Sequence, residues 1–474
     1  MLNVLKRKEI KYLHEWSAQT PHKPIVICGA RQVGKSTLVR EFARAARFSL
    51  LELNFERNPE FRDAFAFRDP TRILSTLSLM TGQTIAAGTS LLFLDEIQAA
   101  PETLAALRYF HEEMPDLHVV AAGSLMEFAL ADTRFSMPVG RVEYMHLGPM
   151  EFEDFLGATG HPELASHLRE LSLSDLDEGA IPGPVHGKYL DLLQQYWVVG
   201  GLPESVSAYA RSRDFTRVSR IHQSVVATYR DDFNKYSHGS LKGRIQMVFD
   251  RLPGMVGRKF KYVQVSRNHR AAELADALRH LCMARVASKI RHTSANGVPL
   301  AAEADERRFK CLYMDVGLMC AALHLDILDL GKRDLTLVND GAVAEQFIGQ
   351  HLLYGGSRYE TPALYYWTRE ARNAAAEVDY LMAPAVQVVP VEIKAGTTGS
   401  LRSLHQFLRE KRRDFALRFN AELPSLLRDS KGLPDGTRID YDLLSLPLYM
   451  VGQARRLVVG CESEREGKVS GEEP

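Results

Sequence analysis

The stretch Gly29-Ala-Arg-Gln-Val-Gly34-Lys35-Ser36-Thr37 fits the phosphate-loop pattern G-x-x-x-x-G-K-[ST] at every fixed position. It follows the apolar run 25–28 and precedes a segment whose apolar residues have helical spacing. The sequence therefore predicts a strand, a glycine-rich turn and the beginning of a helix. Backbone N–H groups in such a turn surround phosphate oxygens, and the helix N-terminus adds partial positive charge. The residues predicted to bind ATP are Gly29, Ala30, Arg31, Gln32, Val33, Gly34, Lys35, Ser36 and Thr37.

Two of these side chains have specific expected roles. Lys35 would reach the β- and γ-phosphates, and the Ser36 hydroxyl would bind Mg²⁺. The cofactors predicted from the loop are therefore ATP and Mg²⁺. A structural glycine turn between a strand and a helix is the alternative, and the full match in a strand–helix context disfavours it.

Another apolar run, 91–94, leads into the acids Asp95 and Glu96. A continuous apolar run is typical of a strand buried on both faces of a parallel sheet. Acids at the carboxyl end of such a strand lie where open α/β sheets bind ligands. We predict that Asp95 orients the Mg²⁺ shell and that Glu96 acts as general base on the attacking water. Gln98 follows closely, and it is interpreted only as a cap for a helix over 102–113.

Two further candidate catalytic positions leave alternatives open. Ser124 ends a predicted buried strand over 118–124, where its hydroxyl would contact the γ-phosphate or the water. Serine is equally favoured as the N-cap of a helix over 125–131. Arg141 is a candidate γ-phosphate-sensing arginine, and an exposed structural arginine is the alternative.

The order of these elements resembles that of the AAA-like P-loop ATPases. It is most similar to a bacterial and archaeal group that carries Gly-Ala-Arg-Gln-Val-Gly-Lys-Ser/Thr and Leu-Asp-Glu-Ile-Gln, strings that stand here at 29–36 and 94–98. The string Gly-Gly-Leu-Pro-Glu at 200–204 also resembles that group's transition into its C-terminal half. The resemblance implies a fold, an ATPase activity and a C-terminal domain of unknown function. Such ATPases often form rings, so a homo-oligomer is also an expectation.

Bulk composition limits the other classes of function. A chain of 474 residues exceeds a single core, so two or three domains are expected. Hydrophobic residues make up 45% and charged residues 25%, with a formal net charge of zero. Any contact with nucleic acid must then come from a local basic patch. The five cysteines show no C-x-x-C spacing, and no apolar run is long enough to span a membrane. We therefore expect a cytoplasmic protein with no membrane contact.

The central part of the chain has a different composition. Residues 157–188 are predicted to be a loop or insertion, followed by helices at 205–211 and 214–236 that form a lid or connector. Residues 241–310 hold 15 Lys and Arg against 6 Asp and Glu. Their pattern predicts helices at 241–257 and 271–282, a short strand at 260–265, and a two-stranded wing ending near 313, as in a winged helix-turn-helix. The candidate contacts to nucleic acid, expected to be DNA, are Arg258, Lys259, Lys261, Arg267, Arg270 and Arg291. A basic face packed on another domain is the alternative.

A second set of acids lies in the C-terminal part. Glu345 shares the apolar face of a predicted helix over 341–354, and a carboxylate there needs a partner or a metal. Predicted strands at 377–382 and 388–394 bring Asp379, Glu392 and Lys394 close together. This order of helix and strands resembles the core of PD-(D/E)xK nucleases. The resemblance implies that Glu345, Asp379 and Glu392 bind Mg²⁺ and that Lys394 assists the attacking water. A cross-strand Lys394–Asp379 ion pair is the alternative.

The predicted fold class is α/β, with an N-terminal parallel-sheet P-loop ATPase domain of AAA-like type. The predicted boundaries are 1–155 for that domain, 156–236 for the insertion and helical connector, 237–330 for the winged-helix segment, 331–458 for a restriction-endonuclease-like domain, and 459–474 for a disordered tail. The last strand is expected near 446–451.

Two functions are compatible with this organisation. The first is an ATP-hydrolysing enzyme that acts on nucleic acid or is regulated by it, with a metal-dependent nuclease-like domain. The second is a nucleotide-dependent switch that acts on a protein partner and carries a catalytically silent nuclease-like domain. Nucleic-acid-stimulated turnover distinguishes the first from the second.

Overall fold

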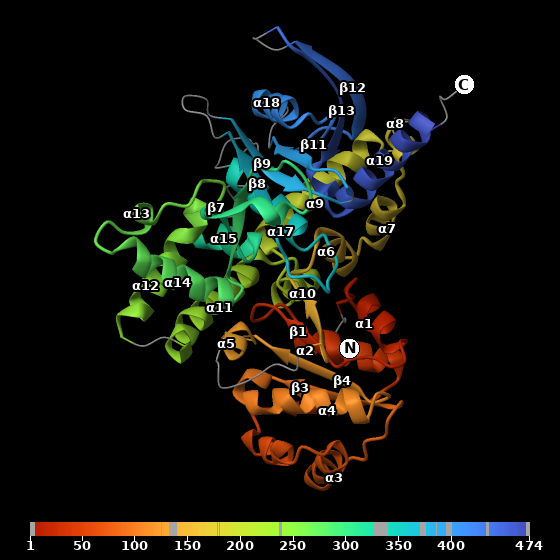
Figure 1. Ribbon diagram of the computed structural model, residues 1–474, viewed down its shortest axis with the longest axis vertical. Coiled ribbons are helices and arrows are strands. Elements are labelled where there is room, and N and C mark those ends of the chain that lie inside the picture. The colour runs from red at the N-terminus through yellow and green to blue at the C-terminus, as the bar shows by residue number, and fades with distance from the viewer. Residues whose placement is uncertain are drawn as a thin grey trace.

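The computed structural model describes residues 5–124, 126–131, 140–177, 179, 181–236, 239–325, 340–369, 376–384, 386–394, 401–432 and 436–470. Two β-sheets lie toward opposite ends of the molecule, and helices fill the space between them and to one side (Figure 1). The N-terminal sheet lies at the bottom of Figure 1 and the C-terminal sheet at the top. This arrangement confirms the predicted α/β class, with a parallel sheet in the N-terminal part.

The N-terminal sheet is parallel throughout. Its strands are β1 (Ile25–Cys28), β2 (Ser49–Asn54), β3 (Ser90–Asp95), β4 (His118–Gly123) and β5 (Glu143–His146). Their order across the sheet is β2-β3-β4-β1-β5. Every residue of β1, β3 and β4 is buried, as a parallel strand covered on both faces requires. The sheet therefore presents the carboxyl ends of β1, β3 and β4 side by side.

Helices of the N-terminal part surround this sheet. They are α1 (Ile10–Ser17), α2 (Lys35–Ala46), α3 (Pro70–Thr81), α4 (Ala106–Glu113) and α5 (Met126–Ala131). The predicted helix over 102–113 begins instead as a 3-10 turn at Pro101–Ala105 before α4.

The central part is helical, including most of the segment predicted as a loop. Its helices are α6 (Phe152–Ala158), α7 (Pro162–Glu170), α8 (Leu173–Asp177), α9 (Gly183–Val199), α10 (Pro203–Ser212), α11 (Phe215–Tyr236), α12 (Ser240–Arg251), α13 (Tyr262–Val265), α14 (Ala271–Met283) and α15 (Val316–Ala322). The loop prediction for 157–188 was wrong because its prolines mark helix starts: Pro162 is the first residue of α7, and Pro182 caps α9.

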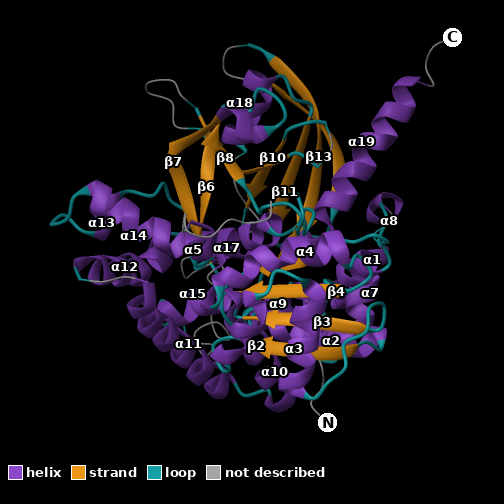
Figure 2. Ribbon diagram, turned by 60° about the horizontal axis from the view of Figure 1, so that its bottom comes forward, coloured by secondary structure: helices purple, strands orange, loops and turns teal. Residues whose placement is uncertain are grey.

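The C-terminal sheet is mixed. Its strands are β6 (Ala287–Thr293), β7 (Ala304–Tyr313), β8 (Tyr365–Thr368), β9 (Glu377–Met382), β10 (Val389–Ile393), β11 (Phe415–Asn420), β12 (Ser425–Gly432) and β13 (Arg438–Pro447). Their order is β12-β13-β11-β10-β9-β8-β6-β7. Figure 2 shows this sheet above the N-terminal one, with α19 extending away from it. The helices of this part are α17 (Asp340–Leu353), α18 (Arg402–Lys411) and α19 (Ala454–Ser470).

The predicted wing belongs to this large sheet. The β6–β7 pair is antiparallel as expected, but β6 also pairs in parallel with β8, so the hairpin does not stand apart. The sheet thus crosses the predicted domain boundary near residue 330, which itself lies outside the described residues. The strand predicted at 260–265 is wrong: 262–265 form the short helix α13. A segment of four residues is too short to show whether its apolar residues follow the spacing of a strand or that of a helix, so the sequence alone did not decide between the two.

The C-terminal end also differs from expectation. The last strand is β13, and the residues predicted as a strand at 446–451 mostly form a 3-10 turn at Leu448–Gln453. Residues 461–470, predicted to be disordered, continue α19 from its apolar first turns. Residues 471–474 of the predicted tail lie outside the described part of the chain.

One hydrophobic core joins the two halves. Phe152 of α6 packs edge-on against Tyr196 of α9 and Phe347 of α17, with ring centroids 5.8 and 6.4 Å away. All three rings are 1% exposed or less. The described helices include none that combines the length and apolar character needed to cross a membrane.

Candidate functional site

The phosphate loop connects β1 to α2 at the carboxyl edge of the N-terminal sheet. Gly34, the last loop residue before α2, has φ +92°, which favours glycine. A Cβ on Gly29 would lie 2.4 Å from the carbonyl oxygen of Leu147, so that position also requires glycine. The loop is therefore shaped by its two glycines, as the sequence pattern predicts.

Lys35 lies inside this loop. Its ammonium group donates to the carbonyl oxygens of Gly29 and Ala30, at 2.9 and 2.8 Å. Burial lowers the pKa of Lys35 to about 8, against the opposing pull of the charge on Glu96. A phosphate group at the loop would give this ammonium a stronger acceptor than two neutral carbonyls.

Ser36 and Asp95 face each other across the site. The Ser36 hydroxyl lies 3.1 Å from both carboxylate oxygens of Asp95, and the Asn54 amide donates to one of these oxygens at 3.1 Å. Burial raises the pKa of Asp95, and the charge of Glu96 adds to that shift. Hydroxyl and carboxylate oxygens are ligands that Mg²⁺ prefers, so this pair fits the ion that accompanies ATP.

Glu96 follows Asp95 in a left-handed conformation, with φ +52°. This conformation is costly for a residue with a side chain, and such residues concentrate at functional sites. Its carboxylate accepts hydrogen bonds from the Gln98 amide at 2.5 Å and from the Ser124 hydroxyl at 3.4 Å. The expected role of Gln98 as a helix cap is therefore replaced by a contact with Glu96. Ser124 lies within the site, as the sensor interpretation requires.

Arg31 connects the loop to more distant segments. Its guanidinium donates to the Ser124 hydroxyl at 3.3 Å and pairs with Asp232 of α11 at 2.9 Å. The Tyr229 hydroxyl, also on α11, donates to the Arg31 carbonyl at 3.0 Å. Asp232 and Tyr229 were missed by the sequence reasoning, because no motif connects them to residues some 200 positions earlier.

Arg141 is not part of this site. It precedes β5, in which Glu143 lies opposite Ile25 at the amino end of β1. The phosphate loop follows the carboxyl end of β1, so about 10 Å of strand separates the two. The Arg141 guanidinium instead lies 2.8 Å from Glu112. The prediction that Arg141 senses the γ-phosphate bound to its own chain was wrong, and the structural alternative fits.

The C-terminal acids surround a lysine that the sequence reasoning missed. Lys310 of β7 is 2% exposed, and its Nζ lies 3.4 Å from Glu345, 2.7 Å from Glu377 and 3.9 Å from Asp379. Burial disfavours its charge, but the attraction of Glu345, Asp379 and Glu377 outweighs burial and raises the pKa of Lys310. Burial in turn raises the pKa of Glu345 to about 8. An ammonium group thus stands where the resemblance to nucleases implied a metal ion.

The other two residues of this predicted site pair with each other, and Asp379 has a further contact. Lys394 pairs with Glu392 at 2.6 Å, and Asp379 accepts a hydrogen bond from the Ile393 N–H at 2.8 Å. Burial, followed by the charge of Asp379, raises the pKa of Glu392 to about 7. Among the residues that the structure describes, no three or more His, Cys, Asp or Glu side chains are arranged to hold a metal. These contacts give no support to a metal site at Glu345, Asp379 and Glu392, and that assignment stays a prediction.

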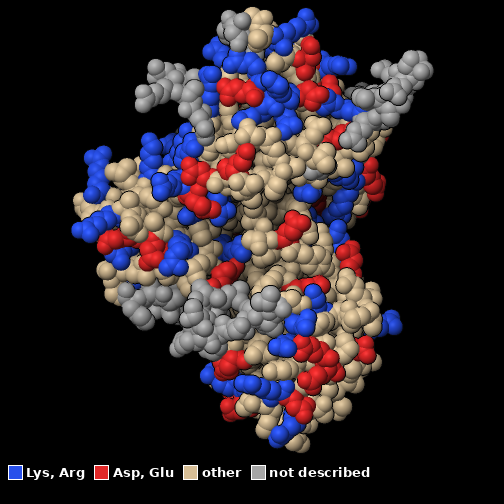
Figure 3. Space-filling view, viewed as in Figure 1, with Lys and Arg blue, Asp and Glu red and all other residues tan. Residues whose placement is uncertain are grey.

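The candidate nucleic-acid contacts lie near α12, α13 and α14. Arg258, Lys259, Lys261, Arg267 and Arg270 are exposed. Arg291 is partly buried and pairs with Glu306 at 2.6 Å. Figure 3 shows Lys and Arg side chains on the face that carries these helices, interspersed with acidic ones.

Three segments match known families. Residues 21–156 match the family model described as an AAA domain. Residues 190–329 and 340–425 match two models, each described as a domain of unknown function (DUF8612 and DUF4143). The N-terminal part is thus similar to AAA domains, in agreement with its parallel sheet and phosphate loop. No curated protein matches the chain.

Similar solved structures are distant. A Walker-type ATPase of Pyrococcus abyssi is 15% identical, with 68% of this chain and 96% of that chain covered and a TM-score of 0.41. The Orc1 protein of Aeropyrum pernix in complex with DNA is 12% identical, with 68% and 94% covered and a TM-score of 0.27. AMPPCP-bound DnaA from Aquifex aeolicus is 12% identical, with 57% and 85% covered and a TM-score of 0.26.

Proposed function

We propose that this protein binds ATP with Mg²⁺ at the phosphate loop and hydrolyses it. The supporting observation is the convergence of side chains from the loop and from the ends of two strands: Lys35, Ser36, Asp95, Glu96 and Ser124. An ion held by Ser36 and Asp95 would neutralise charge on the phosphate oxygens.

Different residues of the site would bind the phosphates and activate the attacking water. The loop N–H groups and Lys35 would hold the phosphates, since both present donors to the same space. Glu96 would accept a proton from the attacking water, and Gln98 and Ser124 would fix the orientation of its carboxylate. Ser124 would also place the Arg31 guanidinium near the transferred phosphoryl group.

A test is an ATPase assay on the full chain with and without Mg²⁺. Wild type is expected to release phosphate, and Lys35→Ala and Glu96→Gln are expected to release little. Binding of a fluorescent ATP analogue in the same samples separates the two variants, since Glu96→Gln should still bind. Absence of binding and turnover by folded wild type would contradict the proposal.

Action on nucleic acid is a second candidate function for the same ATPase. It is favoured by the exposed cations between Arg258 and Arg270, in a chain of zero net charge. If these cations contact phosphates, binding weakens with salt at about one unit of log–log slope per contact. Fluorescence anisotropy with a labelled DNA duplex at several salt concentrations measures this slope. Arg267→Glu should reduce it, whereas Arg44→Glu, on the exposed side of α2, should not.

Cleavage by the C-terminal half is not favoured by the geometry of Lys310. We propose that its acid–lysine cluster is catalytically silent, which is compatible with a nucleotide-dependent switch that regulates a protein partner. DNA incubated with the full chain and Mn²⁺ should remain intact. Cutting that Asp379→Ala or Lys394→Ala abolishes, with ATPase activity retained, would restore the nuclease assignment.

A further inference from the structure

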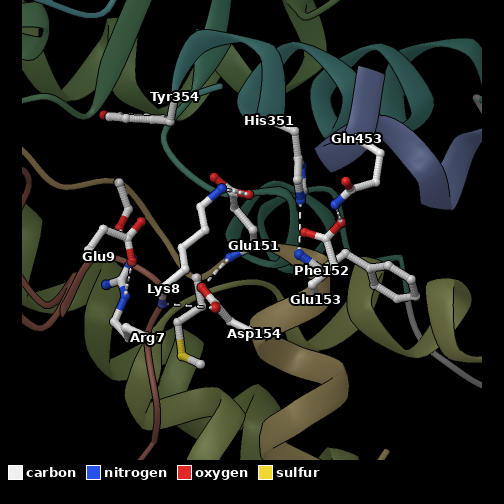
Figure 4. Close-up of polar contacts among 12 residues, drawn as sticks. Arg7, Lys8, Glu9, Glu151, Phe152, Glu153, Asp154, His351, Tyr354 and Gln453 are labelled. Carbon is white, nitrogen blue, oxygen red and sulfur yellow. Dashed lines mark hydrogen bonds and ion pairs between the residues drawn. The ribbon is translucent and has the colours of Figure 1, made fainter. Parts of the chain in front are cut away.

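A buried cluster of charged residues joins the ATPase domain to the C-terminal half. It lies where three segments meet: residues 7–9 before α1, residues 151–154 at the start of α6, and residues 351–358 at the end of α17 and just after it. Figure 4 shows the first two segments together with His351 and Tyr354 of the third. Arg7, Glu9, Glu151 and Arg358 have side chains that are 5% exposed or less. None of these residues belongs to a motif, and the ATPase mechanism proposed above does not use them.

Arg7 contacts the phosphate loop directly. Its guanidinium donates to the carbonyl oxygen of Val33 at 2.6 Å and to that of Gly148 at 2.9 Å. In a trans peptide the carbonyl and the following N–H point in opposite directions. Holding the Val33 carbonyl on the Arg7 side therefore directs the Gly34 N–H away from Arg7, toward the interior of the loop where phosphate oxygens bind.

Arg7 is connected through Glu9 to Arg358 of the C-terminal half. Its Nε donates to Glu9 at 3.1 Å, and the other carboxylate oxygen of Glu9 accepts from Arg358 at 2.9 Å. Arg358 also donates to Glu151 at 2.6 Å. These contacts form a continuous chain from the phosphate loop to a residue 349 positions beyond Glu9.

The backbone adds a second link between the same parts. The Arg358 carbonyl accepts a hydrogen bond from the His146 N–H at 2.8 Å, and His146 lies opposite Cys28, the last residue before the phosphate loop. Further along, the Phe152 N–H donates to the His351 ring at 3.0 Å. The position of residues 351–358 therefore determines the positions of both Arg7 and β5, the strand beside β1.

The surrounding arginines stabilise the charged form of Glu9. Burial alone would raise the pKa of Glu9, but the charges of Arg7 and Arg358 together outweigh it and lower that pKa. Removing one member would leave a buried partner uncompensated, so the cluster responds as a unit.

On the basis of the nucleotide binding proposed above, we propose that Arg7 is a positioning residue of the phosphate loop, and that the Arg7–Glu9–Arg358 chain makes nucleotide affinity depend on the seating of the C-terminal half. Coupling of this kind is reciprocal: nucleotide at the loop must stabilise the contacts at 351–358 by the same factor. The C-terminal half then acts on the ATP site without touching the nucleotide.

The first test measures the affinity of the full chain for ADP with Mg²⁺ by titration calorimetry. Arg7→Met is expected to weaken binding about tenfold, which corresponds to the loss of one hydrogen bond from a charged group. Arg358→Met is expected to weaken binding only several-fold, because Arg358 acts on the loop through Glu9 and Arg7. The double variant should weaken binding no more than Arg7→Met alone, and Arg7→Lys should recover part of the loss. Arg455→Met, an exposed arginine of α19, is the matched control and should bind as wild type does.

The second test needs no variant. Hydrogen exchange at 144–153 and 351–359 is followed in wild type with and without saturating ADP and Mg²⁺, and exchange should slow on binding. Glu9→Gln, which keeps the side-chain volume, should reduce that response even if the methionine variants do not fold. Wild type that binds ADP but shows equal exchange, or an Arg358→Met variant with unchanged affinity, would overturn this inference alone. Wild type that binds no nucleotide would overturn the proposed function as well.

Discussion

The Ser36 hydroxyl lies 3.1 Å from both carboxylate oxygens of Asp95, although 59 positions separate the two residues. Ser36 begins α2 directly after the phosphate loop, and Asp95 ends β3, which β4 separates from β1. The amide of Asn54, at the end of β2, holds the same carboxylate. The oxygen atoms that we propose as Mg²⁺ ligands are thus positioned by the sheet, which would reduce the cost of ordering them around the ion.

Replacement of Lys35 by methionine should weaken ATP binding about 10- to 100-fold, because one charge-assisted contact to phosphate is lost. The wild-type affinity should also fall as the pH rises. Burial lowers the pKa of Lys35 to about 8, so the loop loses its cation above that pH. Titration of a non-hydrolysable ATP analogue from about pH 7 to about pH 9 measures both effects.

Lys35→Met supplies the control for that pH dependence. The variant has no ammonium to titrate, so its weaker affinity should stay nearly constant over the same range. A pH dependence of equal size in wild type and variant would assign the titration to another group.

Replacement of Glu96 by glutamine should lower the turnover number by about 100-fold or more, because a general base contributes about that factor. ATP affinity should change little, since the amide keeps the shape and the contacts with Gln98 and Ser124. Single-turnover phosphate release measures the rate. Glu102→Gln, on the neighbouring 3-10 turn with its side chain 46% exposed, is the control and should turn over normally. Rapid turnover by Glu96→Gln would refute the role of base.

The grouping of Lys35, Ser36, Asp95 and Glu96 was predictable because these residues lie in short local patterns. The glycine-rich loop marks the carboxyl end of one strand, and the apolar run that leads into two acids marks the carboxyl end of another. The parallel sheet then brings these two ends together. The prediction for Arg141 was wrong because the sequence did not show that this residue precedes, rather than follows, a strand parallel to β1.

The charged clusters were not predictable in the same way. Lys310 meets Glu377 only because β6, β7, β8 and β9 are neighbours in one sheet, and that pairing follows from tertiary structure. A buried lysine in the buried second half of β7 carries no motif. Pairs such as Glu9 and Arg358 are separated by most of the chain, so no local spacing indicates them. The helix over 461–470 was missed because its polar composition resembles that of a disordered tail.

Replacement of Lys310 by methionine should lower the free energy of unfolding by about 3 kcal/mol, because it removes a buried cation from three partly buried carboxylates. Lys259 offers a matched control. It contacts the same acid, Glu377, at 3.7 Å, but its side chain is 49% exposed. Lys259→Met should therefore change stability by about 1 kcal/mol or less. Urea unfolding of both variants measures the difference, and equal effects would contradict a special role for the buried lysine.

His351 should make the protein sensitive to acid. Its Nδ1 bonds the Phe347 carbonyl at 2.8 Å, and its Nε2 accepts the Phe152 N–H at 3.0 Å, so the neutral ring satisfies both contacts. Burial lowers the pKa of His351 to about 4, against the raising effect of the charge on Glu151. The folded state therefore binds fewer protons than the unfolded state between that value and the ordinary pKa of about 6.5. The stability that this ring contributes is present above about pH 6.5 and is lost as the pH falls toward 4.

Replacement of His351 by glutamine isolates this contribution. The glutamine carbonyl can accept the Phe152 N–H, but it takes up no proton. Between about pH 6.5 and about pH 4, the slope of unfolding free energy against pH should be shallower in the variant by up to one proton, about 1.4 kcal/mol per pH unit. Wild type carries two other histidines, His146 and His222, whose pKa burial also lowers to about 4, so His351→Gln should remove only part of the acid sensitivity. Identical slopes in wild type and His351→Gln would show that the ring at this contact between α6 and α17 is not protonated on unfolding.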